Sequence, residues 1–294
     1  MTRIFMSPNR HVNTGETYGD DVIDCHVHLW DLEGGYPWIK PGTPHHRVFT
    51  PEDLAESGAG LELTGAILVE ASRGDHEENV LLRDLRLRHP DLLAGHVGNL
   101  NSCAGLGPPG LTRLLAQTRP NGMRLGGGSW DAIPASAREA VPVLAEHGVA
   151  LELNLHHAAL RTAAEVAARH PGLTVIVDHL GNPANLRTAA PDDWREQLRL
   201  AARVPNVILK ISGLLTQQHG VPEHQVADLV ADAVQTLGPG RCVLGSDWPI
   251  CLPRGSRARS LRLSLSGLTG LDEAERRQVL RTTAERAYGL AAQV

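Results

Sequence analysis

Eight short apolar segments recur along this chain, and longer segments with a helical pattern separate most of them. The apolar segments are rich in β-branched residues and nearly continuous in apolar character, which is typical of strands covered on both faces. Alternation of this kind predicts βαβ units and a parallel sheet. The eight segments are 22–28, 64–70, 92–98, 121–125, 149–156, 173–179, 206–212 and 241–247.

The longer segments have apolar residues three and four positions apart, as amphipathic helices do. Pro134 and Pro222 suit the first turns of two of them, and Gly148 and Gly238 suit the positions just past a helix end. The five clearest helical segments are 77–89, 134–147, 158–170, 192–204 and 222–237.

Eight strand-and-helix units in one chain favour a closed (β/α)8 barrel, a fold of about 250 residues. The alternative is an open doubly wound sheet, in which a GxGxxG loop follows the first strand. Here Leu29-Trp30-Asp31 follow the first strand, and the only glycine run, 126–128, follows the fourth. We therefore predict an α/β protein with a single-domain (β/α)8 TIM barrel over residues 22–294, preceded by an irregular leader, 1–21.

Composition excludes several classes of partner. The 28 Lys and Arg residues are outnumbered by 33 Asp and Glu, and a net charge of -5 argues against nucleic-acid binding. No segment reaches 18 consecutive apolar residues, so we expect no membrane span. Four cysteines without CxxC spacing fit a reducing cytoplasm: Cys25, Cys103, Cys242 and Cys251.

Histidine and charged side chains gather at the ends of the predicted strands, where barrel active sites are built. Because side chains alternate along a strand, Asp24, His26 and His28 share one face of the first strand. By the same rule Glu152, Asn154 and His156 share one face of the fifth strand. Other strands end in an acid, a base or an imidazole, and this ring predicts an active site: Glu70, Arg124, His179, Lys210 and Asp247.

Four motifs carry a family resemblance. They are DCHVHLWD at 24–31 with YPW at 36–38, VDHLGNP at 177–183, KISGL at 210–214 and GSDWP at 245–249. In this order they resemble the amidohydrolase superfamily, and within it the amidohydrolase-2 branch of sugar-lactone and pyrone-dicarboxylate lactonases. The resemblance implies a (β/α)8 barrel and a hydrolase that opens a sugar-acid or related lactone.

The resemblance also implies roles for individual residues. His26 and His28 take the first-strand role, His179 the sixth-strand role and Asp247 the eighth-strand role. In many members of the superfamily these residues bind one divalent ion, commonly zinc, and some lactonases of the branch work without metal. The chain departs from the usual lactonase pattern at His156-His157 and in the segment 123–128.

Opening a lactone requires an attacking water, a base for its proton and polarisation of the carbonyl. We predict that Asp247 is the general base. With metal, His26, His28, His156 and Asp247 would form a four-ligand set suited to zinc. Without metal, Arg124 and His179 would polarise the carbonyl as hydrogen-bond donors.

Substrate contacts are predicted for Trp30, Trp248 and Lys210, and Arg124 also suits a substrate carboxylate. Two alternatives stay open. One is a metal-dependent decarboxylase of the same superfamily, and the other is a non-catalytic barrel that binds a sugar acid. The expected partner is a small-molecule lactone, and a homo-oligomer is compatible with the sequence.

Overall fold

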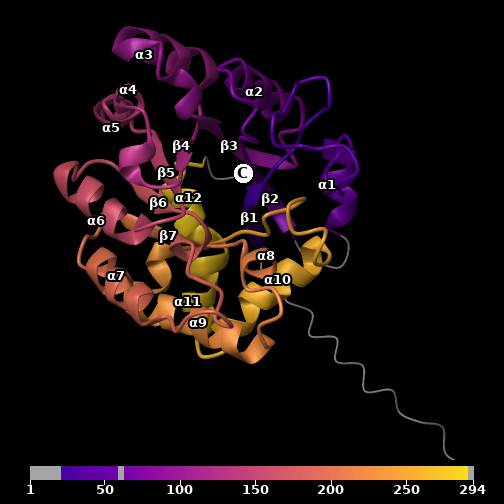
Figure 1. Ribbon diagram of the computed structural model, residues 1–294, viewed down its shortest axis with the longest axis vertical. Helices are drawn as coiled ribbons and strands as arrows, with labels where there is room; N and C mark the ends of the chain where they lie inside the picture. Colours follow the sequence, from indigo (N-terminus) through magenta and orange to yellow (C-terminus); the bar gives the residue numbers. More distant parts are fainter. Residues whose placement is uncertain (1–20, 59–62, 291–294) are drawn as a thin grey trace, which may run out of the picture.

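A computed structural model describes residues 21–58 and 63–290, so the expected leader lies outside the described residues except for Asp21. Eight parallel strands form one sheet in the order β1 to β8, with helices around it (Figure 1). Each predicted strand is present. The strands are β1 Val22–Val27, β2 Leu63–Val69, β3 Leu93–Asn99, β4 Gly122–Gly127, β5 Ala150–Leu155, β6 Val175–Val177, β7 Val207–Ile211 and β8 Cys242–Leu244.

The sheet closes into a barrel just beyond the end of β8. The Asp247 backbone N–H donates to the carbonyl of His26 at 2.9 Å, and the His28 N–H donates to the carbonyl of Trp248 at 2.8 Å. Val27 and Trp248 form a parallel bridge between these bonds. The predicted single-domain (β/α)8 barrel is confirmed, and the open sheet is excluded.

The five predicted helical segments are all helical, and one of them is divided. The predicted helix 134–147 is two helices, α4 and α5, and Pro142 stands in the first turn of α5, where its missing N–H costs no hydrogen bond. The helices are α1 Pro51–Ser57, α2 Glu78–Arg88, α3 Gly107–Thr118, α4 Ala135–Arg138, α5 Val141–His147, α6 Ala159–Arg169, α7 Asp192–Ala202, α8 Leu214–Gln217, α9 Glu223–Leu237, α10 Arg257–Leu265, α11 Glu273–Arg277 and α12 Thr283–Ala287.

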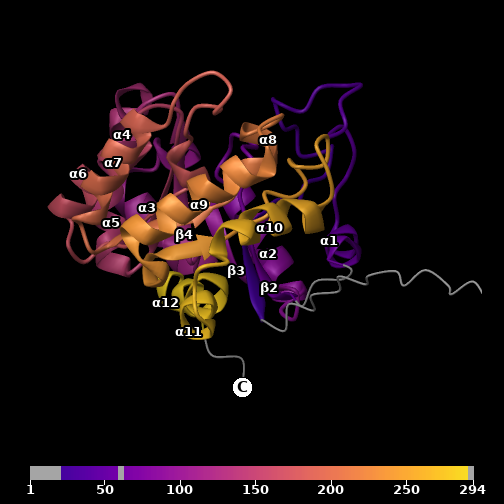
Figure 2. The same cartoon turned by 90° about the horizontal axis from the view of Figure 1, so that it is seen from below.

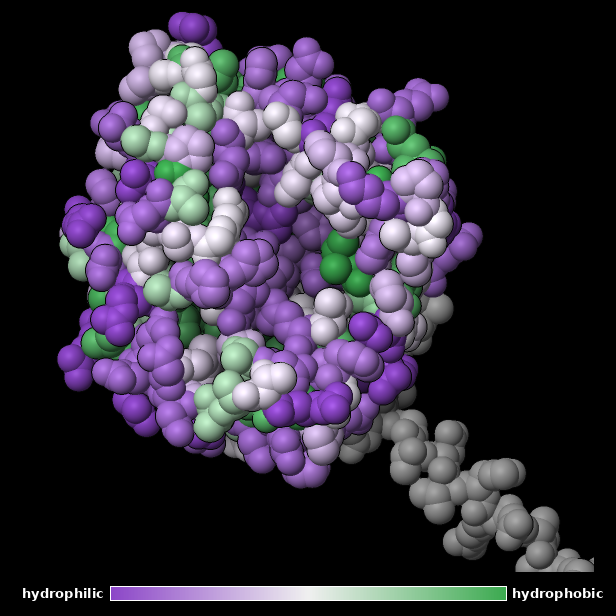
Figure 3. All heavy atoms as spheres, in the orientation of Figure 1, coloured by the Kyte–Doolittle hydropathy of each residue, from purple (hydrophilic) through white to green (hydrophobic). Residues whose placement is uncertain are grey.

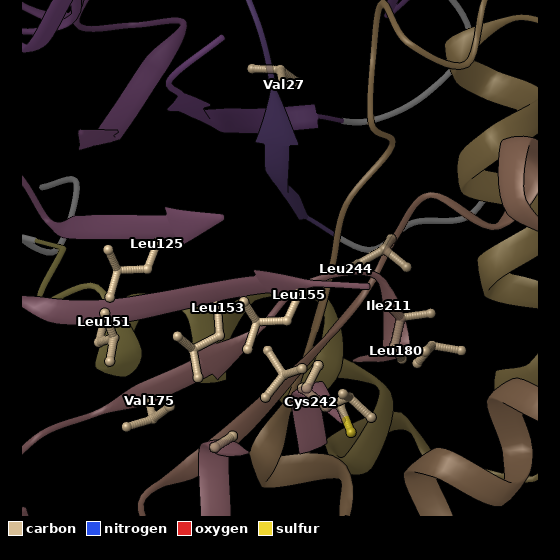
Figure 4. Close-up of a cluster of buried hydrophobic side chains, with 14 of the residues drawn as sticks. Val27, Leu125, Leu151, Leu153, Leu155, Val175, Leu180, Ile211, Cys242 and Leu244 are labelled. Carbon is tan, nitrogen blue, oxygen red and sulfur yellow. The ribbon is translucent and has the colours of Figure 1, made fainter. Parts of the chain in front are cut away.

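The core lies between the strands and the surrounding helices, and Figure 4 shows part of it. On β5 the fully buried Leu151, Leu153 and Leu155 belong to this core. The residues between them, Glu152 and Asn154, have polar partners instead. Glu152 pairs with Lys210 inside the barrel, whereas Asn154 lines a pocket at the strand ends. Strand alternation thus separates the packing residues of β5 from its polar ones.

The two ends of the barrel differ. Helices α11 and α12 lie at one end and α8 at the other (Figure 2). After α12, the buried Tyr288 donates a hydrogen bond to the Glu152 carboxylate, and its carbonyl accepts one from Asn121 at 2.8 Å. The C-terminal segment therefore covers the end opposite α8.

The four cysteines are free and buried. In residues 21–58 and 63–290, no helix is both long and apolar enough to cross a membrane.

Candidate active site

A pocket opens at the carboxyl ends of the strands, and Figure 3 shows a largely hydrophilic hollow near the centre of this face. Its volume is about 490 Å³. A second, polar pocket of about 420 Å³ adjoins it and shares Ser72, Arg124, Asn154 and His156 with it. The first pocket, which we call the catalytic pocket in anticipation of the chemistry proposed below, is lined by His28, Trp38, Ala71, Ser72, Arg124, Asn154, His156, His179, Asn182, Thr216, Gln217, Asp247 and Ile250.

Left-handed backbone marks the strand ends around this pocket. Ser72, His179, Asn182 and Asp247 all have φ between 54° and 60°. Residues other than glycine adopt this conformation rarely, and such strain concentrates at functional sites. The strands β6 and β8 have three residues each, fewer than predicted, and His179 and Asp247 stand at their predicted ends.

Three side chains converge at the point where the barrel closes. The Nε2 atoms of His26 and His28 lie 3.1 Å apart, and Asp247 Oδ1 lies 3.7 Å and 3.6 Å from them. Ligands of a tetrahedral zinc ion with bonds of 2.0–2.1 Å are separated by about 3.3–3.4 Å. The size of this triangle and its N/O donor set therefore fit a divalent metal ion.

Hydrogen bonds orient both imidazoles. His28 Nδ1 lies 3.0 Å from the Val69 carbonyl, so Nδ1 holds the proton and the Nε2 lone pair faces the triangle. The other ring, His26, is fully buried, and its Nδ1 lies 3.2 Å from Lys210 Nζ. Burial and the Lys210 charge lower the pKa of His26, against the opposing effect of Asp178. Neutral imidazoles are the form that binds metal.

His179 lies beside this triangle. His179 Nδ1 is 2.9 Å from the Ser212 hydroxyl, and its ring centroid is 4.6 Å from that of His26. Burial lowers the pKa of His179, and the nearby carboxylates of Asp247 and Asp178 reduce this effect. The imidazole is therefore neutral at neutral pH and retains a proton that it can donate.

Asp247 is an ionised carboxylate in this setting. Burial alone would raise its pKa, but the nearby imidazoles of His179, His28 and His26 lower the pKa to about 2. Only 5% of the residue is exposed, and it lines the pocket. A buried, ionised acceptor next to a ligand pocket has the position that a general base requires.

Asp24 does not share the surroundings of the two histidines, so the alternation rule is wrong at this residue. The β1–β2 register shifts between Asp24 and Val27. Asp24 Oδ2 accepts from Arg257 Nε of α10 at 2.8 Å, and Oδ1 accepts from the Ser246 N–H at 2.8 Å. An irregular strand thus directs Asp24 to a helix and His26 to the barrel interior.

His156 is also placed differently from the prediction. It is exposed and lines the pocket. Two groups of side chains in the described chain could hold a metal ion, and neither includes His156: His26, His28 and Asp247 form one, and His26, Asp178 and His179 form the other. On the same face of β5, Glu152 lies at the level of Lys210, which contacts His26. Four residues of strand span about 13 Å, so His156 lies well beyond that level. The structure does not support His156 as a ligand.

The three predicted substrate-binding residues line neither pocket in the described chain. Trp30 and Trp248 are each 2% exposed and pack against Phe49. Lys210 is fully buried, and its Nζ pairs with Glu152 at 2.8 Å and Asp178 at 2.9 Å. These residues support the walls and the floor of the site.

Arg124 lines both pockets, but its charge is already paired. Its guanidinium lies 2.5 Å from the Glu70 carboxylate, donates to the Glu70 carbonyl at 3.0 Å and lies 3.7 Å from Asp178. The structure therefore brings Arg124 to the site without leaving it a free charge.

Sequence reasoning missed most of the neutral lining. Asn182 and Trp38 belong to the motifs at 177–183 and 36–38, which could have indicated them. Thr216 and Gln217 follow the KISGL motif without any signal of their own. Their place in the pocket depends on how the chain turns after β7, where Gly213 has φ 70°.

Comparison with known proteins places this chain in a family. A family model described as "Amidohydrolase" matches residues 23–290. The chain is similar to L-fucono-1,5-lactonase of Burkholderia multivorans, with 28% identity over 294 residues, 91% of this chain and 96% of the relative.

Solved structures share the fold. An amidohydrolase of Burkholderia multivorans with bound zinc has a TM-score of 0.81 and 27% identity, covering 92% of this chain and 100% of its own. A putative 2-pyrone-4,6-dicarboxylic acid hydrolase of Pseudomonas putida, 22% identical, has a TM-score of 0.72 and covers 92% and 97%. The chain is therefore an enzyme of the amidohydrolase family, in the branch that contains lactonases.

Proposed function

We propose that this enzyme hydrolyses a lactone by attack of water on the ester carbonyl. The observation that carries the proposal is the buried triangle of His26, His28 and Asp247 at the pocket, with the carboxylate ionised. Similarity to an L-fucono-1,5-lactonase along nearly the whole chain supports the reaction class. Ester hydrolysis requires a base for the attacking water and a hydrogen-bond donor for the carbonyl oxygen. In this pocket Asp247 and His179 are suited to these two roles.

In this proposal Asp247 accepts the proton of the attacking water. With Ser212 as the donor to its Nδ1, His179 keeps its proton on Nε2 and donates it in a hydrogen bond to the carbonyl oxygen, where negative charge develops. Arg124, held by Glu70, contributes positive potential near His26, whose Nε2 is 3.5 Å away. Burial strengthens each of these electrostatic effects.

We also propose that His26, His28 and Asp247 hold one divalent ion, with zinc the expected metal. When bound, such an ion supplies Lewis acidity towards the carbonyl and makes water more acidic. The donor set and the related structure with bound zinc support this assignment. The four buried free cysteines fit a reducing compartment, and we propose a cytoplasmic enzyme.

The base is tested by Asp247→Asn. We expect a folded protein that loses about 10²–10⁴-fold in kcat on its lactone, because a general base contributes that much. Stopped-flow or pH-indicator assays measure turnover, and circular dichroism checks the fold. Asp131→Asn is the matched control, since Asp131 is exposed and lines neither pocket. Near-normal turnover by a folded Asp247→Asn enzyme would place the base elsewhere.

The metal assignment is tested by elemental analysis of purified variants. We expect about one zinc per wild-type chain, little in the double variant His26→Ala/His28→Ala, and wild-type content in His156→Ala. The contrast follows from the triangle, which contains both first-strand histidines but not His156. Loss of zinc from His156→Ala would restore that residue to the ligand set. A metal-free wild type that resists chelators and retains full activity would overturn the metal proposal.

A further inference from the structure

One wall of the catalytic pocket consists of neutral polar side chains. We name Asn154, Asn182, Thr216 and Gln217 the amide wall. Gln217 Nε2 donates to Asn182 Oδ1, and Asn182 Nδ2 donates to Asn154 Oδ1 at 3.1 Å and to the Leu155 carbonyl at 2.7 Å. Each amide is therefore oriented by the next, from α8 across the loop after β6 to β5.

Two oxygens of this wall have no partner. Thr216 Oγ1 and Gln217 Oε1 are shielded from water and make no hydrogen bond within the described chain. An unpaired buried polar atom is costly, and such atoms in native proteins require an explanation. An amide oxygen only accepts hydrogen bonds, and a hydroxyl both donates and accepts. A ligand with hydroxyl groups supplies partners for both atoms, whereas an ionised carboxylate has no proton for Gln217.

The charged side chains of the two pockets also favour an uncharged substrate. Among the Lys and Arg residues of the described chain, Arg124 alone lines them, and it is paired with Glu70. Lys210 lies beneath the pocket, fully buried between two carboxylates. Two acidic side chains, Glu70 and Asp247, also line these pockets. A carboxylate on the substrate would therefore find no unpaired Lys or Arg side chain in these pockets.

We propose that the amide wall binds ring hydroxyl groups, so that the substrate is an uncharged polyhydroxylated lactone and not a carboxylated one. On binding, side-chain rotation at Thr216 and Gln217 turns their unpaired oxygens to the substrate hydroxyls. This inference rests on the proposed lactone hydrolysis and specifies its substrate class.

The substrate class is tested with the wild-type enzyme on three kinds of lactone. The probes are a panel of uncharged aldono-1,5-lactones, unsubstituted δ-valerolactone and 2-pyrone-4,6-dicarboxylate. We expect kcat/KM for the best aldonolactone to exceed that for each other probe by at least about 100-fold, the effect of two or more hydrogen bonds. Faster hydrolysis of either other probe would overturn the inference and leave lactone hydrolysis standing. No turnover of any probe would overturn the proposed function itself.

The wall is tested by Thr216→Val, which keeps the shape of the side chain and removes its unpaired hydroxyl. We expect an unchanged or higher Tm, because no protein hydrogen bond is lost, and an about tenfold lower ratio of kcat/KM for the aldonolactone over δ-valerolactone. Thr188→Val is the matched control, since its hydroxyl bonds the Asn185 carbonyl outside both pockets. It should keep the wild-type ratio.

Gln217→Met provides a second variant of similar volume and should lower the same ratio. A ratio unchanged in both Thr216→Val and Gln217→Met would show that the amide wall does not bind the substrate hydroxyls. A lower Tm in Thr216→Val together with an unchanged ratio would show that its hydroxyl is structural, and would also overturn the inference.

Discussion

His96 on β3 is a fully buried histidine that lines neither pocket. Both ring nitrogens lack a hydrogen-bond partner within the described chain. Burial, with smaller effects of Arg86 and Arg83, lowers its pKa to about 3. The folded protein therefore keeps this imidazole neutral at a pH where the unfolded chain protonates it.

This difference predicts acid sensitivity. Because the unfolded chain binds the proton near pH 6.5 and the folded protein only near pH 3, the free energy of unfolding should fall as pH decreases between those values. The slope for one group reaches about 1.4 kcal/mol per pH unit. Urea unfolding at pH 7 and at pH 5 measures this fall in the free energy of unfolding. Between these two pH values the His96→Leu variant should lose less stability than the wild type. The exposed His219→Gln should behave as wild type, and an equal loss in His96→Leu would refute the assignment.

Single residues were predictable to the extent that a strand determines which way they face. His26, His28, His179 and Asp247 do lie together, because their strands end at one rim. Alternation does not give the level of a residue along the barrel, which is why His156 was misplaced. It also does not show whether a charge is already paired, as it is in Lys210. Partners contributed by distant segments are invisible in a single sequence.

At the scale of elements, helix α10 holds the strands that close the barrel. Arg257 in its first turn, 2% exposed, donates to Asp24 at 2.8 Å and to the Leu54 carbonyl at 3.0 Å. Asp24 also accepts the Ser246 N–H, and the Ser260 hydroxyl donates to the Ser246 carbonyl. One buried ion pair thus fixes the segment between β8 and Asp247.

Arg257→Met should destabilise the fold by about 3–5 kcal/mol, because it leaves the Asp24 carboxylate buried without its cation. Chemical denaturation measures the loss. On the same helix, Arg259→Met is the control, since Arg259 is exposed and 3.5 Å from Glu223, and should change stability by less than about 0.5 kcal/mol. Equal effects of the two substitutions would show that the buried Arg257–Asp24 pair contributes no more to stability than an exposed ion pair does.

Element positions were more predictable than element ends. Apolar runs located all eight strands, and helical periodicity located five helical segments. Both patterns follow from burial along a single segment. The predicted ends of β6 and β8 fall on the left-handed residues His179 and Asp247, and an apolar run does not reveal such a change of backbone conformation. The division of segment 134–147 at Pro142 was readable in principle, since proline prefers a first helical turn.

At the scale of the whole molecule, the barrel closes where the proposed metal ligands meet. His26 lies in β1, His28 follows its last residue, and Asp247 follows β8. Direct backbone bonds across this junction are few, and the segment 245–249 provides them. An ion held by all three side chains would connect the first and last strands of the fold.

Zinc should therefore stabilise the whole protein. At a free zinc concentration 100 times the Kd, the gain is about 2.7 kcal/mol, which corresponds to roughly 4–5 °C in Tm for a chain of this size. Differential scanning fluorimetry of chelated protein, with and without zinc, measures the shift. The His26→Ala/His28→Ala variant should show none. An equal rise in that variant would assign the effect to zinc bound elsewhere.

The ion pair between Arg124 and Glu70 has an evolutionary consequence. The guanidinium that a carboxylated lactone would require is present in the pocket, and Glu70 neutralises it. Glutamate and glutamine codons differ by a single base. One nucleotide change at position 70 would therefore remove the nearer of the two carboxylates beside Arg124 and leave only Asp178, 3.7 Å away. We therefore expect a Glu70→Gln enzyme to accept anionic lactones better than the wild type does.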